Sequence, residues 1–204
     1  IEVLNILNTK YIIDADAQTG ERYVMVNPDA NGAAWFVDNL FFVKGAAAEL
    51  EALATVDLRR EAVVDERFGD IIDISTPGIT TDSLAAVNIV EYRPNYLKYE
   101  TLAATEQVAV FSEMYYDKGW TAYVDGEEAP YFRADYLLRA MVVPAGTHTI
   151  EWRFRAPRFA AVEGVTLAAS IAILLWLAVA ILFDRRKNCR QKNDTQKTDH
   201  PKTI

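Results

Sequence analysis

The feature that most constrains this chain is an unbroken apolar stretch near its C-terminus. Residues 165–183 read VTLAASIAILLWLAVAILF and carry no charge; Thr166 and Ser170 are their only polar side chains. As an α-helix this stretch would be about 29 Å long, and the hydrocarbon core of a bilayer is about 30 Å thick. Its apolar residues lie on all sides of the helix, unlike those of an amphipathic surface helix. The sequence predicts one transmembrane helix over residues 160–183, with a buried core helix as the alternative.

Basic residues follow this stretch at once, in DRRKNCRQK at 184–192. Residues 184–204 hold seven Lys and Arg against three Asp, a net charge of +4, whereas residues 1–183 carry −12. Lys and Arg gather on the cytoplasmic side of membrane helices. We therefore expect a cytoplasmic C-terminus and an extracytoplasmic location for residues 1–158. The segment 184–204 is expected to be a disordered basic tail, because it is polar and nearly free of apolar residues.

Composition removes several functional classes. The 204 residues carry a formal net charge of −8, which gives no reason to expect a nucleic-acid partner. A single cysteine, Cys189, and two histidines, His148 and His200, leave no disulfide framework and no Cys/His zinc site. We therefore predict no metal and no cofactor. The chain begins at Ile1 without a methionine or a signal peptide, so we expect it to be part of a longer protein.

Alternating apolar residues predict antiparallel strands over residues 84–158. The clearest run is 147–155, where His148, Ile150, Trp152 and Phe154 share one face and polar residues share the other. Turn sequences such as Asp125-Gly126 separate the runs. The other predicted strands are 87–92, 96–102, 108–114, 120–124 and 137–143. Short strands at this spacing favour an antiparallel β-sandwich.

Residues 1–83 predict a small α+β extracytoplasmic segment. Strands are expected at 23–26, 35–37, 62–64 and 71–74, and a helix at 46–54 with Leu50 and Leu53 on the face that packs on the sheet. Pro77-Gly78 marks the expected boundary with the sandwich. The predicted fold class is therefore α+β, mainly β: a small α/β segment, an antiparallel β-sandwich and one C-terminal transmembrane helix. A single continuous outer domain is the alternative.

Aromatic and charged residues are dense between residues 114 and 139. Exposed aromatic faces beside charged hydrogen-bonding groups can hold a sugar ring or a lipid-linked headgroup. Aromatic residues also fill sandwich cores, and Arg133 and Asp135 could pair with each other or with neighbouring strands. No catalytic residue is recognisable. The candidate substrate-binding residues are Tyr115, Tyr116, Arg133, Asp135, Tyr136 and Arg139.

Several ordered motifs lie between residues 115 and 157. They are a Gly-Trp strand start at 119–120, an Asp-Gly hairpin at 125–126, an Arg-Ala-x-Tyr strand at 133–136 and a Pro-Ala-Gly-x-His turn at 144–148, followed by a membrane helix. Together they resemble the C-terminal extracytoplasmic module of the bacterial YfhO family of polytopic membrane proteins. LNTKYII at 7–13 and NPDANGAAWFV at 27–37 also look like this family's pattern.

The resemblance implies that this chain is the end of a polytopic inner-membrane protein related to the GT-C glycosyltransferases. Those enzymes transfer sugars from polyprenyl-phosphate donors at the outer face of the membrane, and their acidic catalytic residue lies in an early loop upstream of this region. The implied role is that of an accessory domain in glycosylation of cell-envelope polymers. The implied partners are the lipid bilayer, a polyprenyl-phosphate sugar donor, a glycopolymer acceptor and upstream transmembrane helices. The alternative is a non-catalytic, membrane-anchored envelope domain that binds glycan or acts as a scaffold.

Overall fold

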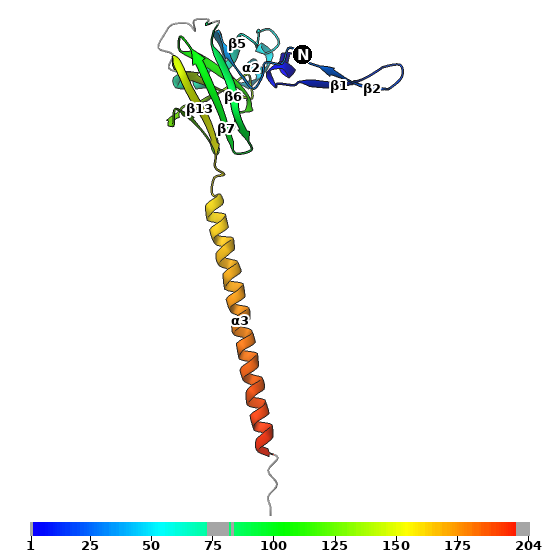
Figure 1. Cartoon of the computed structure of the whole chain (residues 1–204), viewed down its shortest axis with the longest axis vertical. Coiled ribbons are helices and arrows are strands. Elements are labelled where there is room, and N and C mark those ends of the chain that lie inside the picture. The colour runs from blue at the N-terminus through cyan, green and yellow to red at the C-terminus, as the bar shows by residue number, and fades with distance from the viewer. Residues whose placement is uncertain (1, 73–81, 83, 199–204) are drawn as a thin grey trace, which may run out of the picture. The chain divides into compact units, whose positions relative to one another are not determined.

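A computed structural model describes residues 2–72, 82 and 84–198 of the chain, which form two compact units, Ile1–Arg155 and Ala156–Ile204. The first unit is built mainly from strands, and the second contains one long helix (Figure 1). The predicted fold class, mainly β with a C-terminal apolar helix, is confirmed.

The first unit contains two large sheets, whose strands are mainly antiparallel, and one small sheet. The five-stranded sheet has the order β10-β9-β13-β7-β6, and the six-stranded sheet has the order β3-β8-β12-β11-β5-β4. β1 and β2 form a separate two-stranded hairpin. The strands are β1 (Tyr11–Ala15), β2 (Arg22–Val26), β3 (Ala34–Val37), β4 (Asn39–Val43), β5 (Glu61–Asp65), β6 (Ala86–Arg93), β7 (Tyr96–Ala103), β8 (Gln107–Met114), β9 (Trp120–Val124), β10 (Glu127–Ala129), β11 (Phe132–Ala134), β12 (Leu138–Val143) and β13 (Gly146–Phe154).

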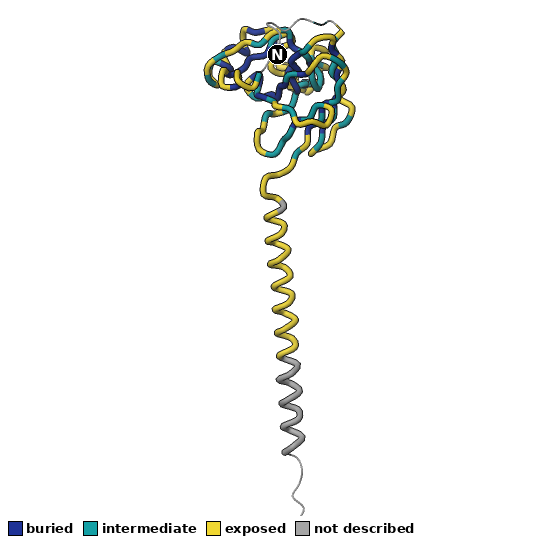
Figure 2. The backbone as a smooth tube through the Cα atoms, turned by 90° about the vertical axis from the view of Figure 1, so that its left-hand side faces the viewer, coloured by how far each residue is buried: buried dark blue, intermediate teal, exposed yellow. Residues whose placement is uncertain are grey.

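The central strands of the six-stranded sheet are buried on both faces. In β8, Ala109 and Phe111 pack with Trp152 of the five-stranded sheet, whereas Val108 and Val110 pack into a second core. That second core also contains residues of the helices α1 (Glu2–Ile6), α2 (Ala46–Ala52) and η1 (Glu66–Ile71). The unit therefore has three layers, two sheets and a helical layer, and Figure 2 shows how its buried positions gather inside it.

The predicted boundary between residues 1–83 and 84–158 does not separate two domains. Trp35 of β3 pairs with Val110 of β8, and Val64 of β5 pairs with Ala134 of β11, so strands from both segments share one sheet. The reason is that β8 and β11 need hydrogen-bonding neighbours on both edges, and the first segment supplies them. The alternative of one continuous domain is the one found.

Helix α2 connects β4 to the parallel strand β5 and packs on them through one face. Glu49, Ala52 and Leu53 form this buried face, because residues three and four apart lie on the same side of a helix. Leu50, predicted to pack inward with Leu53, is 56% exposed. The prediction was right for Leu53 and wrong for Leu50.

The second unit contains α3 (Phe159–Thr198). Within its segment Ala161–Phe183, an 18-residue window has a mean hydropathy of 2.6 and no buried residue, so α3 is long and apolar enough to cross a membrane. The helix continues through 184–198, where composition predicted a disordered tail. Arg, Lys and Gln are good helix formers, and extending a helix that already exists costs little.

Two further predictions concern residues around the gap in the described chain. The strand predicted at 71–74 is not found at Ile71, which ends the 3-10 helix η1. Residues 73 and 74 and the predicted boundary at Pro77-Gly78 lie outside the described residues.

Candidate functional site

Arg133 and Tyr136, two of the predicted binding residues, hold α2 against the sheet. Arg133 Nη2 donates to Glu49 Oε2 at 2.5 Å, and Asp65 Oδ2 lies 4.0 Å from the same nitrogen. The backbone N–H of Tyr136 donates to Glu49 Oε1 at 2.9 Å. The Glu49 side chain is fully buried, and each of its two oxygens accepts a hydrogen bond from one of these donors. These groups stabilise the fold, and the Tyr136 ring, 39% exposed, is the accessible part.

Asp135 is fully buried in the turn between β11 and β12. Its backbone has a φ of 50°, and Tyr136 follows at 70°; this left-handed conformation is one that Asp tolerates well. Oδ1 accepts a hydrogen bond from the Val63 N–H at 2.8 Å. Burial raises the pKa of Asp135 to about 7, against the smaller lowering effect of that hydrogen bond. The side chain ties the turn to β5.

Arg139 is buried between two indole rings. Its guanidinium carbon lies 4.1 Å from the centre of the Trp120 ring and 5.0 Å from that of Trp152, and Nε donates to the Met114 carbonyl at 2.8 Å. Burial lowers the pKa of Arg139, and the charge of Glu113 opposes that effect. Arg139 lies opposite Arg133 on the neighbouring strand. Like charges on facing residues repel each other, and the separate contacts of the two guanidinium groups offset that repulsion.

Tyr115 and Tyr116 differ in exposure. The Tyr115 ring is half-buried, with its centre 5.8 Å from the Phe68 ring and 5.6 Å from the Tyr131 ring. Burial raises the pKa of the Tyr115 hydroxyl. Tyr116 is 48% exposed, and its carbonyl accepts a hydrogen bond from the Tyr131 hydroxyl at 3.2 Å. The six predicted residues therefore do not converge on one open surface.

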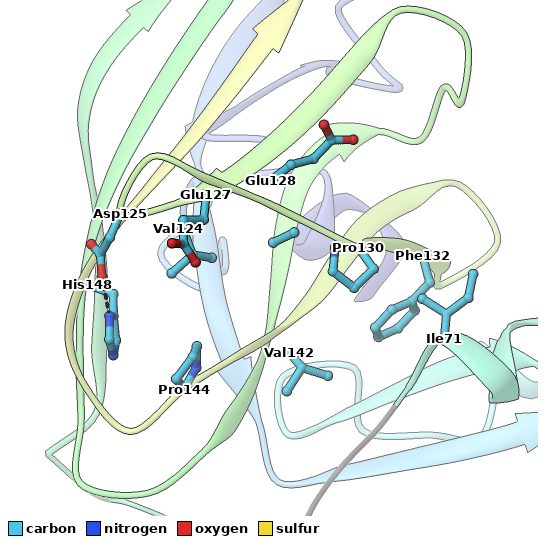
Figure 3. Close-up of a pocket in the computed structure, with 11 residues that line it drawn as sticks. Ile71, Val124, Asp125, Glu127, Glu128, Pro130, Phe132, Val142, Pro144 and His148 are labelled. Atoms are coloured by element: carbon cyan, nitrogen blue, oxygen red, sulfur yellow. Dashed lines mark hydrogen bonds and ion pairs between the residues drawn. The ribbon is translucent and has the colours of Figure 1, made fainter.

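A cavity of about 510 Å³ lies elsewhere in the first unit, beside the β9–β10 turn. Its wall is apolar and its rim carries carboxylates and a histidine. Figure 3 shows Asp125 and His148 at one end of it and Phe132 and Ile71 at the other. The lining residues are Ile71, Val124, Asp125, Glu127, Glu128, Ala129, Pro130, Phe132, Val142, Pro144 and His148.

The polar end of the cavity is held in place by local contacts. Asp125 and Gly126 both have positive φ, 52° and 89°, which makes the tight hairpin turn predicted from this dipeptide. His148 Nδ1 lies 2.6 Å from Asp125 Oδ2, and Nε2 lies 3.1 Å from the Ala145 carbonyl. The hydrogen bond to Asp125 raises the pKa of His148, and the pKa of Asp125 is lowered in return. With two oxygen acceptors, the ring is suited to the charged imidazolium form.

Sequence reasoning missed two features of these sites. Glu49 was overlooked because its partner Arg133 is 84 positions away. His148 was placed on a core-facing strand surface, whereas it is half-buried and bound to Asp125. The turn dipeptide Asp125-Gly126 and the histidine near the start of β13 were the available signals for the second feature.

Among the described residues, no group of three or more His, Cys, Asp or Glu side chains is arranged to hold a metal ion. Comparison of the chain with protein families, characterised proteins and solved structures found no match.

Proposed function

We propose that this chain is an extracytoplasmic module, anchored in the bacterial inner membrane by α3, that supports a larger machinery acting on lipid-linked sugars. The apolar span Ala161–Phe183, the basic residues after it and the family-like motifs of residues 115–157 support this proposal. In this proposal the module binds ligand or partner, and the transfer chemistry belongs to upstream parts of the protein.

The cavity beside the β9–β10 turn is the observation that carries the binding role. Ligand sites are usually concave, largely apolar and several hundred Å³ in volume, with a few polar groups at defined places. Pro130 and Pro144, which are exposed, offer flat apolar surfaces to the C–H face of a sugar ring. Glu127 on the rim is an acceptor for hydroxyl groups, whereas the Glu128 carboxylate points away from the cavity (Figure 3). Because the rim carries the carboxylates of Asp125 and Glu127 against one histidine, a neutral sugar suits it better than a phosphate group.

The ligand role can be tested by saturation-transfer NMR on the full chain in detergent micelles, with neutral mono- and oligosaccharides as probes. Val142→Trp fills the cavity, and Val90→Trp on the exposed face of β6 is the matched control. We expect sugar signals that disappear in the first variant and persist in the second. Glu127→Gln tests the rim without touching the core. Equal signals in all four proteins, or none in the wild type, would contradict sugar binding here.

The orientation can be tested separately, because the chain carries its own reporter. In intact cells, a membrane-impermeant maleimide should leave Cys189 unlabelled and should label an Ala17→Cys variant, whose new thiol lies in the exposed β1–β2 loop. Labelling of Cys189 from outside would reverse the proposed topology. Sequencing the coding DNA upstream of Ile1 and counting further apolar spans of about 20 residues tests the polytopic origin.

A further inference from the structure

The β1–β2 hairpin extends away from the two large sheets (Figure 1). Many of its exposed side chains are apolar. Tyr11 and Val26 are opposite each other in the register, as are Ile13 and Val24, so these four side chains share one face. They are 62–70% exposed. A two-stranded hairpin is marginally stable alone in water, and a third strand or a cover is normally needed.

The hydrogen bonds of the hairpin show which backbone groups of β1 are free to pair. The N–H of Asn27 donates to the Lys10 carbonyl, and the N–H of Asp16 donates to the Glu21 carbonyl. The backbone N–H and C=O groups of successive residues in a strand point to opposite edges. Those of Lys10, Ile12, Asp14 and Asp16 therefore point toward β2. The N–H and C=O groups of Tyr11 and Ile13 therefore point to the outer edge of β1. Within the part of the chain that the structure describes, this edge pairs with no strand.

We propose that the outer edge of β1 pairs antiparallel with β1 of a second copy of this chain, about a twofold axis between the two Ile12 residues. In this register Tyr11 exchanges hydrogen bonds with Ile13 of the second copy, and Ile12 faces Ile12. Lys10 faces Asp14 of the second copy, and the symmetry gives that ion pair twice. Two hairpins then form one four-stranded sheet.

Neighbouring registers fit less well. Moving the axis to Ile13 sets Ile12 opposite Asp14, and moving it to Tyr11 sets Ile12 opposite Lys10. The outer edge of β2 offers no comparable ion pair. Glu21 and Arg22 are adjacent, so their backbone groups point to opposite edges of the strand, and the two residues cannot face each other in a symmetric antiparallel pair. Pairing β1 with β2 of another copy would leave free edges and build an open chain of molecules, whereas the β1 pair closes on itself. This inference does not depend on the proposed sugar site.

A symmetric disulfide tests the register in the full chain in detergent micelles, with Cys189→Ser as background. Ile12→Cys should form a covalent dimer under mild oxidation, because facing residues on paired strands have Cβ atoms about 5 Å apart. Val24→Cys is the control, since its two copies would be separated by three strand spacings, about 14 Å. A dimer from Val24→Cys, or none from Ile12→Cys, would overturn the proposal.

Charge reversal gives a second test that does not need a new cysteine. The dissociation constant of the dimer is measured by energy transfer between labelled copies of the full chain in micelles. Lys10→Asp and Asp14→Lys should each weaken the dimer about tenfold, because two opposite-charge pairs become like-charge pairs. The double variant should restore the wild-type value. If it stays as weak as the single variants, the Lys10–Asp14 pairing is wrong.

Discussion

Loss of the Glu49 carboxylate is expected to destabilise the first unit by about 3–5 kcal/mol, the usual cost of breaking a buried ion pair by removing one partner. The side chain is fully buried and accepts from Arg133 Nη2 at 2.5 Å and from the Tyr136 N–H at 2.9 Å. In Glu49→Ala the guanidinium keeps Asp65 at 4.0 Å as its nearest carboxylate, and the N–H loses its acceptor. A buried group left without a partner costs about 1–3 kcal/mol, and a charged one more.

The assay is urea unfolding of the full chain in detergent micelles, followed by tryptophan fluorescence. Trp35 and Trp152 lie in the two cores and report on the first unit. Glu51→Ala, on the exposed side of the same helix, is the control and should stay within about 0.5 kcal/mol of the wild type. Glu49→Gln should fall between, because its amide oxygen still accepts from Tyr136. Equal stabilities of the Glu49→Ala and Glu51→Ala proteins would refute this account of α2 packing.

Three other substitutions, at Asp135 and Arg139, test the remaining buried charges by the same unfolding assay. Burial raises the pKa of Asp135 from 3.8 to about 7, so the folded state binds its proton more tightly than the unfolded state between these values. The contribution of Asp135 to stability should therefore fall as pH rises from about 4 to about 7. Asp135→Asn, which keeps an acceptor for Val63 N–H, should gain on the wild type across that window by up to about 4 kcal/mol. Arg139→Lys should cost about 2–3 kcal/mol, because it loses the stacking on Trp120 and Trp152 while a charge stays buried. Arg139→Met should cost less, because it removes the charge at similar volume; the reverse order would contradict the cation–indole account.

The positions of strands could be predicted from the alternation of apolar and polar residues wherever one face of the strand is buried and the strand is long enough to show it. The predicted 120–124 is β9 itself, and 147–155 differs from β13 by one residue at each end. β10 and β11 contain three residues each, too few to show an alternation. β4 was missed because NLFFV has no alternation, and its pairing with β5 is fixed by the helix between them.

The chemical roles of the predicted site residues were less accessible from sequence than their positions. Arg133 and Asp135 stood out as charged residues within an aromatic-rich stretch, and pairing with each other or with neighbouring strands was an open alternative. Their partners, Glu49 and the N–H of Val63, are 84 and 72 positions away. Such contacts depend on how the sheet is assembled, which the local pattern of a strand does not specify.

These long-range contacts also predict how the first unit must fold. Without residues 1–83, Arg133 would lose Glu49, Asp135 would lose the Val63 N–H, and β8 would lose its pairing with β3. Two buried charges and an open sheet edge would then face water or remain unsatisfied. We expect a fragment of residues 84–158 to lack cooperative urea unfolding and to show poorly dispersed amide NMR signals, whereas residues 1–158 should unfold in one transition. A fragment of 84–158 with native-like dispersion and a sharp transition would show that the sandwich strands are sufficient, and that the contacts to the first segment are added to an already stable domain.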